Sequence, residues 1–347
     1  MNKFTAYIGT YTSGESDGIY SFKVDASSGK TSDLKLAAKL ENPTYLAFDN
    51  NNTHLYSVAK SDKLGAAAAF SMNNGNLIFL NSECADKNPP AELEGKQPCH
   101  VYLDKENKYL FSSNYHAGRI EVFPINSDGS LGKVSSSIVH AGQEKKPHVH
   151  CGIVTPDNNY LCVVDLGLDK VIAYTFKNGI LSKVNELNLK SGCGPRHMTF
   201  SKDGRFAYIY TELSSEVVVL TYSPSDCSFN ILQYISSLPK DYTGHNQGAA
   251  IHISPDGNFL YTSNRGHDSI SCFKINTSTG MLELSYVTSV EGISPRDFNI
   301  TPNGNFILAA NQDSNNVTVF KVNKTSGEIM YINEDIKIGS PVCVKIL

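Results

Sequence analysis

A hairpin pattern that recurs along the chain constrains the fold more than any other feature. It consists of a short apolar strand, a turn such as Pro-Asp-Gly-Asn and a returning strand, as in residues 251–264, IHISPDGNFLYTSN. The spacings between successive turns are 55, 51, 46, 53 and 47 residues, a period typical of four-stranded propeller blades and longer than most helical repeats. The turns align on these marker positions: Asn50, Lys105, Pro156, Lys202, Pro255 and Pro302.

Each hairpin is followed by a stretch with the alternation of a half-buried strand. A turn such as Ser-Thr-Gly then leads into a fourth strand, and no long segment has the 3.6-residue period of a helix. The sequence therefore predicts an all-β protein with four antiparallel strands in each repeat. The predicted third strands are residues 17–25, 119–126, 170–176, 216–222, 269–276 and 316–323.

The two ends of the chain each resemble part of one repeat. Residues 4–11 resemble a second strand, and residues 340–346, SPVCVKI, resemble a first strand. Joining them closes a seventh blade and removes the exposed edges of an open array. We predict one seven-bladed β-propeller domain over residues 1–347, in which residues 341–346 are hydrogen-bonded beside residues 4–9.

The composition is that of a soluble globular protein and argues against several classes of partner. Of the 347 residues, 40% are hydrophobic and 18% charged, and the net charge of −4 argues against a nucleic-acid surface. No apolar run is long enough for a membrane helix, and the first residues lack the apolar core of a signal peptide. We expect a cytoplasmic protein that is a monomer or a weak homodimer. We also expect its eight cysteines to be reduced, because they form no Cys-x-x-Cys pair.

Polar residues gather where the first strand of a repeat begins and where its second strand ends, two points that share one rim of a blade. Arg196 and Glu212 flank a single hairpin, so we expect them to lie close together. Three of the five arginines occupy such rim positions, a concentration that favours a functional site over simple solvation of the rim. The entry positions are Thr44, Cys99, His150, Arg196, Ala249 and Arg296, and the exit positions are Lys60, Tyr115, Leu166, Glu212, Arg265 and Gln312.

Other polar residues beside the rim positions can support or extend this site. One position before an exit position stand Asn114, Asp165, Thr211, Asn264 and Asn311, which could hold the rim side chains by hydrogen bonds. His148 lies two residues before His150, on the same side of an extended strand. His267 and Tyr11 can also reach the rim, and the sequence does not rank them. The predicted substrate-binding residues are His100, His150, Asp165, His197, Asn264, Arg296 and Asn311.

Two shorter motifs carry less weight. Residues 14–18, GESDG, match Gly-x-Ser-x-Gly, but a nucleophilic serine at Ser16 would need a helix after it, and a strand follows instead. His148 and His150 could hold two positions of a zinc ion, but no third ligand with suitable spacing accompanies them. We therefore expect no metal.

At these positions the chain resembles the seven-bladed lactonase family, which includes propeller-type 6-phosphogluconolactonases and carboxymuconate lactonizing enzymes. Matching stretches run through nearly the whole chain, among them YIGTYT, QPCHVYL, KPHVHCGIVTPD, GCGPRHMTFSKDGRFAYIYTEL and SPDGNFLYTSNRGHDSI. The resemblance implies catalytic roles for His148, Arg196, Glu212 and Arg265. The chain departs from the family at Ala59-Lys60, where an Asn-Glu pair is usual, and this departure bears on substrate preference.

The reaction that the resemblance implies is hydrolysis of 6-phosphoglucono-1,5-lactone to 6-phosphogluconate, a step of the pentose phosphate pathway, without metal or cofactor. Glu212 or His148 would deprotonate water, and Arg196 would stabilise the oxyanion. Arg265 and Arg296 suit a phosphate or carboxylate. The alternatives are lactonization of a carboxylated muconate, hydrolysis of another lactone, and a non-enzymatic binding platform, which would show exposed apolar residues on its rim.

Overall fold

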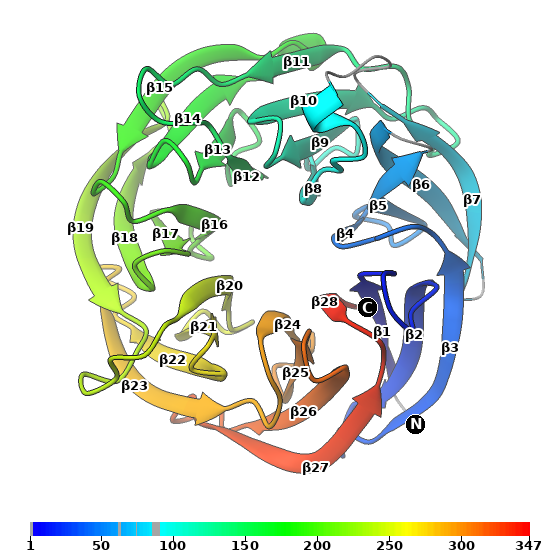
Figure 1. Ribbon diagram of the computed structural model, residues 1–347. Helices are drawn as coiled ribbons and strands as arrows, with labels where there is room; N and C mark the ends of the chain where they lie inside the picture. Colours follow the sequence, from blue (N-terminus) through cyan, green and yellow to red (C-terminus); the bar gives the residue numbers. More distant parts are fainter. Residues whose placement is uncertain (1–2, 62–63, 74, 85–90) are drawn as a thin grey trace. The chain divides into compact units, whose positions relative to one another are not determined.

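A computed structural model describes residues 3–61, 64–73, 75–84 and 91–347 (Figure 1). In these ranges the strands form seven four-stranded antiparallel sheets, which confirms the predicted all-β class and the four strands per repeat. The helical segments among these residues are two single 3-10 turns, η1 (Ala91–Leu93) and η2 (Lys177–Gly179). No helix in the described ranges is long and apolar enough to cross a membrane.

The chain divides into two compact units. The first unit comprises Met1–Leu36, Arg196–Tyr222 and Phe229–Leu347, and the second comprises Ala37–Pro195 and Ser223–Ser228. The expectation of a single domain over residues 1–347 stays a prediction.

The first unit holds most of four sheets. In order across each sheet, the strands are β28 (Pro341–Ile346), β1 (Lys3–Thr10), β2 (Gly18–Asp25) and β3 (Thr31–Lys39); β16 (Pro195–Phe200), β17 (Phe206–Thr211), β18 (Glu216–Ser223) and β19 (Ser228–Ser236); β20 (Gln247–Ile253), β21 (Phe259–Arg265), β22 (Ser269–Ile275) and β23 (Leu282–Ser289); and β24 (Pro295–Ile300), β25 (Phe306–Asn311), β26 (Asn316–Val322) and β27 (Ile329–Lys337).

The second unit holds the other three sheets. Their strands are β4 (Leu46–Phe48), β5 (His54–Ser61), β6 (Leu64–Asn73) and β7 (Asn76–Glu83); β8 (His100–Leu103), β9 (Tyr109–Asn114), β10 (Arg119–Pro124) and β11 (Ser136–Val139); and β12 (Val149–Val154), β13 (Leu161–Asp165), β14 (Lys170–Thr175) and β15 (Ser182–Asn188).

The two ends of the chain pair in one sheet, as the sequence predicts. Strand β28 runs antiparallel to β1, with Ala6 opposite Ile346 and Gly9 opposite Cys343. Thr5 and Leu347 extend the ladder by exchanging both backbone hydrogen bonds, at 2.8 and 2.9 Å. The N-terminal strand is thus covered on both edges, by β2 and by β28.

The first strand of several sheets carries a β-bulge at a predicted rim position. In β12 the extra residue is His150, in β24 it is Arg296, and in β20 Ala249 and Ala250 together oppose Ser263. A bulge interrupts the two-residue alternation of a strand and re-aims the side chain at that point. His148 lies before the first residue of β12, and His150 is the bulged residue. The expectation that both side chains lie on the same side of an extended strand therefore does not follow from strand alternation here.

Apolar side chains of neighbouring sheets form the core within each unit. In the first unit, Tyr261 and Phe298 are fully buried between the sheet of β20–β23 and the sheet of β24–β27. At the strand turns, carboxylates such as Asp256 accept hydrogen bonds from their own turn, here from the Asn258 backbone N–H at 3.1 Å. These aspartates are turn residues.

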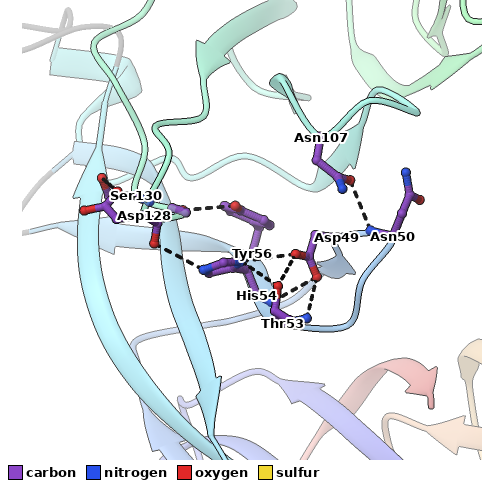
Figure 2. A network of polar contacts seen from close by, with 9 residues as sticks. Asp49, Asn50, Thr53, His54, Tyr56, Asn107, Asp128 and Ser130 are labelled. Carbon is purple, nitrogen blue, oxygen red and sulfur yellow. Dashed lines mark hydrogen bonds and ion pairs between the residues drawn. The ribbon is translucent and has the colours of Figure 1, made fainter.

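A polar network in the second unit shows how such turns are tied to neighbouring sheets (Figure 2). His54 Nδ1 lies 3.1 Å from Asp49 Oδ2, and its Nε2 lies 3.1 Å from the backbone carbonyl oxygen of Asp128. A carboxylate oxygen and a carbonyl oxygen both accept only, so each ring nitrogen of His54 faces a hydrogen-bond acceptor. Tyr56 donates to the Gly129 carbonyl at 3.0 Å, so β5 is joined to the segment between β10 and β11.

Candidate active site

The Glu212 carboxylate lies between two guanidinium groups in the first unit. Glu212 follows β17, Arg196 is the second residue of β16, and Arg265 is the last residue of β21. Glu212 Oε2 is 3.1 Å from Arg196 Nε and 3.0 Å from Arg265 Nη2. No described residue donates a hydrogen bond to Glu212 Oε1. The expected proximity of Arg196 and Glu212 is confirmed.

The bulge of β20 supplies the carbonyl groups that hold both arginines. Arg196 Nη1 donates to the Ala249 carbonyl at 2.8 Å, and Arg265 Nη2 donates to the Gly248 carbonyl at 3.1 Å. A Cβ atom on Gly248 would lie 2.2 Å from the Thr211 carbonyl oxygen, so only glycine fits this close approach. The backbone of β20 therefore fixes the cluster.

The three charges of the cluster are largely removed from water. The side chains of Arg196, Arg265 and Glu212 are 4%, 11% and 16% exposed. Burial, together with the positive charge of Arg196 and of Arg296, lowers the pKa of Arg265 to about 10, so this arginine remains a cation at neutral pH. Two guanidinium groups and one carboxylate give the cluster a net positive charge, which favours an anion or a developing oxyanion.

A fully buried network stands behind Arg265. Asn264 Oδ1 accepts hydrogen bonds from Tyr210 Oη at 2.5 Å and from Ser237 Oγ at 2.7 Å. Asn264 Nδ2 donates to Ser271 Oγ at 2.9 Å. Burial raises the pKa of Tyr210 well above its usual value, so its hydroxyl keeps its proton and donates. Asn264 is 0% exposed, an arrangement that suits positioning of Arg265 more than contact with a ligand.

Three further predicted residues also lie in the first unit. His197 is buried against Arg196, with Nε2 at 3.3 Å from Arg196 Nη1. Asn311 is fully buried; its Nδ2 donates to Thr318 Oγ1 at 3.0 Å, and its Oδ1 has no hydrogen-bond partner among the described residues. Arg296 is half-buried, and its Cζ atom lies 5.6 Å from the ring centroid of Tyr11.

Two predicted histidines of the second unit, His148 and His150, contact the ring of Tyr115. The ring of His148 stacks on Tyr115 with centroids 4.1 Å apart, and the ring of His150 meets it edge-on at 6.1 Å. His148 Nδ1 lies 3.0 Å from the Tyr115 carbonyl oxygen, which can only accept, so Nδ1 carries the proton. Nε2 of a neutral His148 is then the basic nitrogen.

Asp165 and His100 are buried in the same unit. Asp165 is 0% exposed and accepts from the His148 backbone N–H at 2.8 Å, while its other oxygen lies 2.7 Å from His140 Nδ1. His100 packs against Tyr45 with ring centroids 4.3 Å apart. The sequence suggested that Asp165 holds a rim side chain by a hydrogen bond, and in the structure it holds the backbone N–H of His148.

The loop that leads into Arg196 is anchored by a carboxylate of the second unit. Asp169 Oδ2 accepts from the Gly192 N–H and Oδ1 from the Gly194 N–H, both at 2.8 Å. Lys145 Nζ lies 2.5 Å from Oδ2. Burial by itself would raise the pKa of Asp169. The hydrogen bonds from Lys145 and the two backbone amides outweigh burial, so the pKa of Asp169 is lowered.

The serine of the Gly-x-Ser-x-Gly motif has a structural environment. Ser16 Oγ is buried and lies 2.5 Å from Thr10 Oγ1, and strand β2 follows it. In the part of the chain that the structure describes, no group of three or more His, Cys, Asp and Glu side chains is arranged to hold a metal ion.

The sequence did not reveal that backbone carbonyl groups hold the arginines of the site. Ala249 stands at a rim position, and its side chain gave no functional signal, but its carbonyl holds Arg196. Gly248 and Asp169 were likewise not singled out. A glycine directly before a rim position was the one available hint.

Comparison with known proteins places this chain in a family. The family model "Lactonase, 7-bladed beta-propeller" matches residues 5–346. A 6-phosphogluconolactonase of Bacillus subtilis (strain 168) is 42% identical, and the alignment covers 100% of this chain and 99% of that protein.

Two solved structures match this chain over its full length. A protein from Lactobacillus plantarum is 36% identical, with a TM-score of 0.92 and coverage of 100% of both chains. The periplasmic gluconolactonase PpgL of Pseudomonas aeruginosa is 30% identical, with a TM-score of 0.92 and coverage of 100% of this chain and 99% of that one.

The chain belongs to the lactonase family with the seven-bladed β-propeller fold. It is accordingly a carboxylic ester hydrolase that acts on lactones.

Proposed function

We propose that the protein hydrolyses 6-phosphoglucono-1,5-lactone to 6-phosphogluconate, with Glu212 as the general base. The observation that carries the proposal is the one-sided anchoring of Glu212: both arginine contacts use Oε2. Oε1 is thereby held in a fixed direction and accepts no hydrogen bond from a described residue. A carboxylate oriented in this way can accept a proton from a water molecule.

The chemistry then follows from the charges of the cluster. Glu212 Oε1 takes a proton from water while the water oxygen attacks the lactone carbonyl, and the carbonyl oxygen gains negative charge. Arg196 stabilises that charge, because its guanidinium is buried and held by the Ala249 carbonyl before the reaction starts. When the ring C–O bond breaks, the proton on Glu212 passes to the leaving oxygen.

His148 remains the alternative base. Its Nδ1–H donates to the Tyr115 carbonyl, which leaves Nε2 able to accept a proton in the neutral ring. Replacing His148 with Gln and Glu212 with Gln, each alone, separates the two assignments, since the loss of the true base lowers kcat far more than the loss of the other residue.

The substrate and setting are inferred from the relatives and from the charge of the site. The Bacillus subtilis relative is named a 6-phosphogluconolactonase, and the Pseudomonas aeruginosa relative is named a periplasmic gluconolactonase. We favour the phosphorylated lactone because the site carries Arg296 in addition to the two paired arginines. A cytoplasmic monomer or weak homodimer, without nucleic-acid or membrane partners, is part of the proposal.

Direct measurement of lactone disappearance tests the proposal. We would compare 6-phosphogluconolactone with unphosphorylated gluconolactone and subtract the spontaneous hydrolysis of each. The expected result is a higher kcat/KM for the phosphorylated lactone. A rate on 6-phosphogluconolactone no greater than that of buffer would refute the proposed substrate.

A further inference from the structure

The arginines of the first unit differ in what they already bind. Arg196 contacts Glu212 and the Ala249 carbonyl, and Arg265 contacts Glu212 and the Gly248 carbonyl. Arg296 makes no hydrogen bond or ion pair with any residue that the structure describes. Of Arg196, Arg265 and Arg296, it is therefore Arg296 that contacts no carboxylate of a described residue.

Arg296 is nevertheless held in place. It is the extra residue of the β24 bulge, and its Cζ atom lies 5.6 Å from the centroid of the Tyr11 ring. Tyr11 is itself fixed, because it directly follows β1 and its backbone N–H donates to the Ser340 carbonyl at 3.0 Å. Arg296 also lies close enough to Arg265 for its charge to lower the pKa of that residue.

A guanidinium that contacts an aromatic face keeps its N–H groups available for another partner, whereas a salt bridge occupies them. The ring attracts the guanidinium through its π electrons, so the N–H groups at the edge of the guanidinium are not consumed. Those groups match the oxygens of a phosphate, which carries about −1.5 to −2 charges at neutral pH. A carboxylate partner in place of Tyr11 would occupy the same groups and cancel the charge.

We infer that Tyr11 is a positioning residue for substrate specificity: its ring orients Arg296 to bind the phosphate group of a phosphorylated lactone. The inference rests on the proposed function for the identity of the substrate. It adds that the preference for phosphate depends on the Tyr11 ring as well as on the charge of Arg296.

Calorimetric binding of 6-phosphogluconate and of gluconate tests this inference without relying on turnover. Wild type should bind the phosphorylated acid more tightly. Tyr11→Leu should reduce that preference roughly tenfold, and Tyr11→Phe, which keeps the ring, should retain it within about twofold. Arg296→Ala should abolish the preference, and adding Tyr11→Leu to it should have no further effect, because Tyr11 acts through Arg296.

The controls keep the result interpretable. Tyr11→Met also removes the ring and replaces Tyr11→Leu if that variant does not fold, and Glu328→Gln, at an exposed position, serves as a surface variant. The inference is overturned if wild type binds the two acids equally, if Tyr11→Leu keeps the full preference, or if Tyr11→Phe loses as much as Tyr11→Leu. If 6-phosphogluconate binds as expected but its lactone is not hydrolysed, the phosphate site stands and the proposed reaction fails.

Discussion

Arg196 Nε lies 3.1 Å from Glu212 Oε2, across the hairpin of β16 and β17. Both side chains are mostly buried, so each neutralises a charge that would otherwise be costly to keep out of water. The same oxygen also meets Arg265 at 3.0 Å, which orients the carboxylate from two directions. Substitutions in this cluster and in the backbone around it should therefore change activity and stability in ways that can be measured separately.

Glu212→Gln should keep the fold and lower kcat for lactone hydrolysis by about 100- to 10,000-fold, because the amide cannot accept the proton from water. Steady-state assays with direct detection of the lactone measure kcat for each variant. Glu328→Gln, an exposed glutamate in the same unit, is the matched control. A kcat for Glu212→Gln within about threefold of wild type, well short of that loss, would remove Glu212 as the base and leave His148.

Gly248→Ala should destabilise the protein by about 1–3 kcal/mol, the usual range for overpacking, and should lower activity. The added Cβ would lie 2.2 Å from the Thr211 carbonyl oxygen and 2.9 Å from the Tyr210 ring, so the backbone that holds Arg196 and Arg265 must shift. Denaturant unfolding measures the loss. Gly14→Ala is the control, because a Cβ there has no atom within 4 Å, and equal stability of the two variants would contradict the argument.

Asp169→Asn should lower stability at pH 7 by about 1–3 kcal/mol, since a charged acceptor of two backbone N–H groups is lost. The pKa of Asp169 is lower in the folded protein than in the unfolded chain, so its contribution is complete above the unfolded value. That contribution is lost as the pH falls through the folded pKa.

The difference between wild type and Asp169→Asn should therefore be largest near neutral pH and should shrink below about pH 4. Unfolding curves across this range measure it. Asp17→Asn, at an exposed position, is the control. A difference that stays constant down to pH 3 would show that the charge of Asp169 is not what stabilises the loop.

Lactonase activity should survive removal of divalent metal ions. In the proposed mechanism, Glu212 supplies the base, and the guanidinium of Arg196, which cannot ligate a cation, stabilises the oxyanion. Activity should be measured before and after EDTA treatment and gel filtration. Loss of activity that one divalent ion restores would contradict this mechanism and would return attention to His148 and His150 as ligands.

The sequence by itself determined the repeat, its strands and the closure of the chain ends. The turn signals at positions such as Pro255 and Pro302 set the period, and the alternation of apolar residues set the strands between them. The pairing of the two ends followed from the half-repeats that they carry. Arg196 and Glu212 could be paired because one hairpin, closed by a local turn, separates them.

Only the tertiary structure decided how the site is held. Arg265 and the carbonyls of Gly248 and Ala249 reach the cluster through strands that are paired by backbone hydrogen bonds, and a bulge shifts that pairing without a clear signature in the side chains. For Asn264, the sequence suggested both a supporting hydrogen bond and a ligand contact. Its burial and the hydrogen bonds of its amide to Tyr210 and Ser271 favour the supporting role. The tertiary structure also decides which rim residues keep their hydrogen-bonding groups available for a ligand. Arg296 does so beside Tyr11, a residue far from it in the sequence, and spacing along the chain does not specify such a partner.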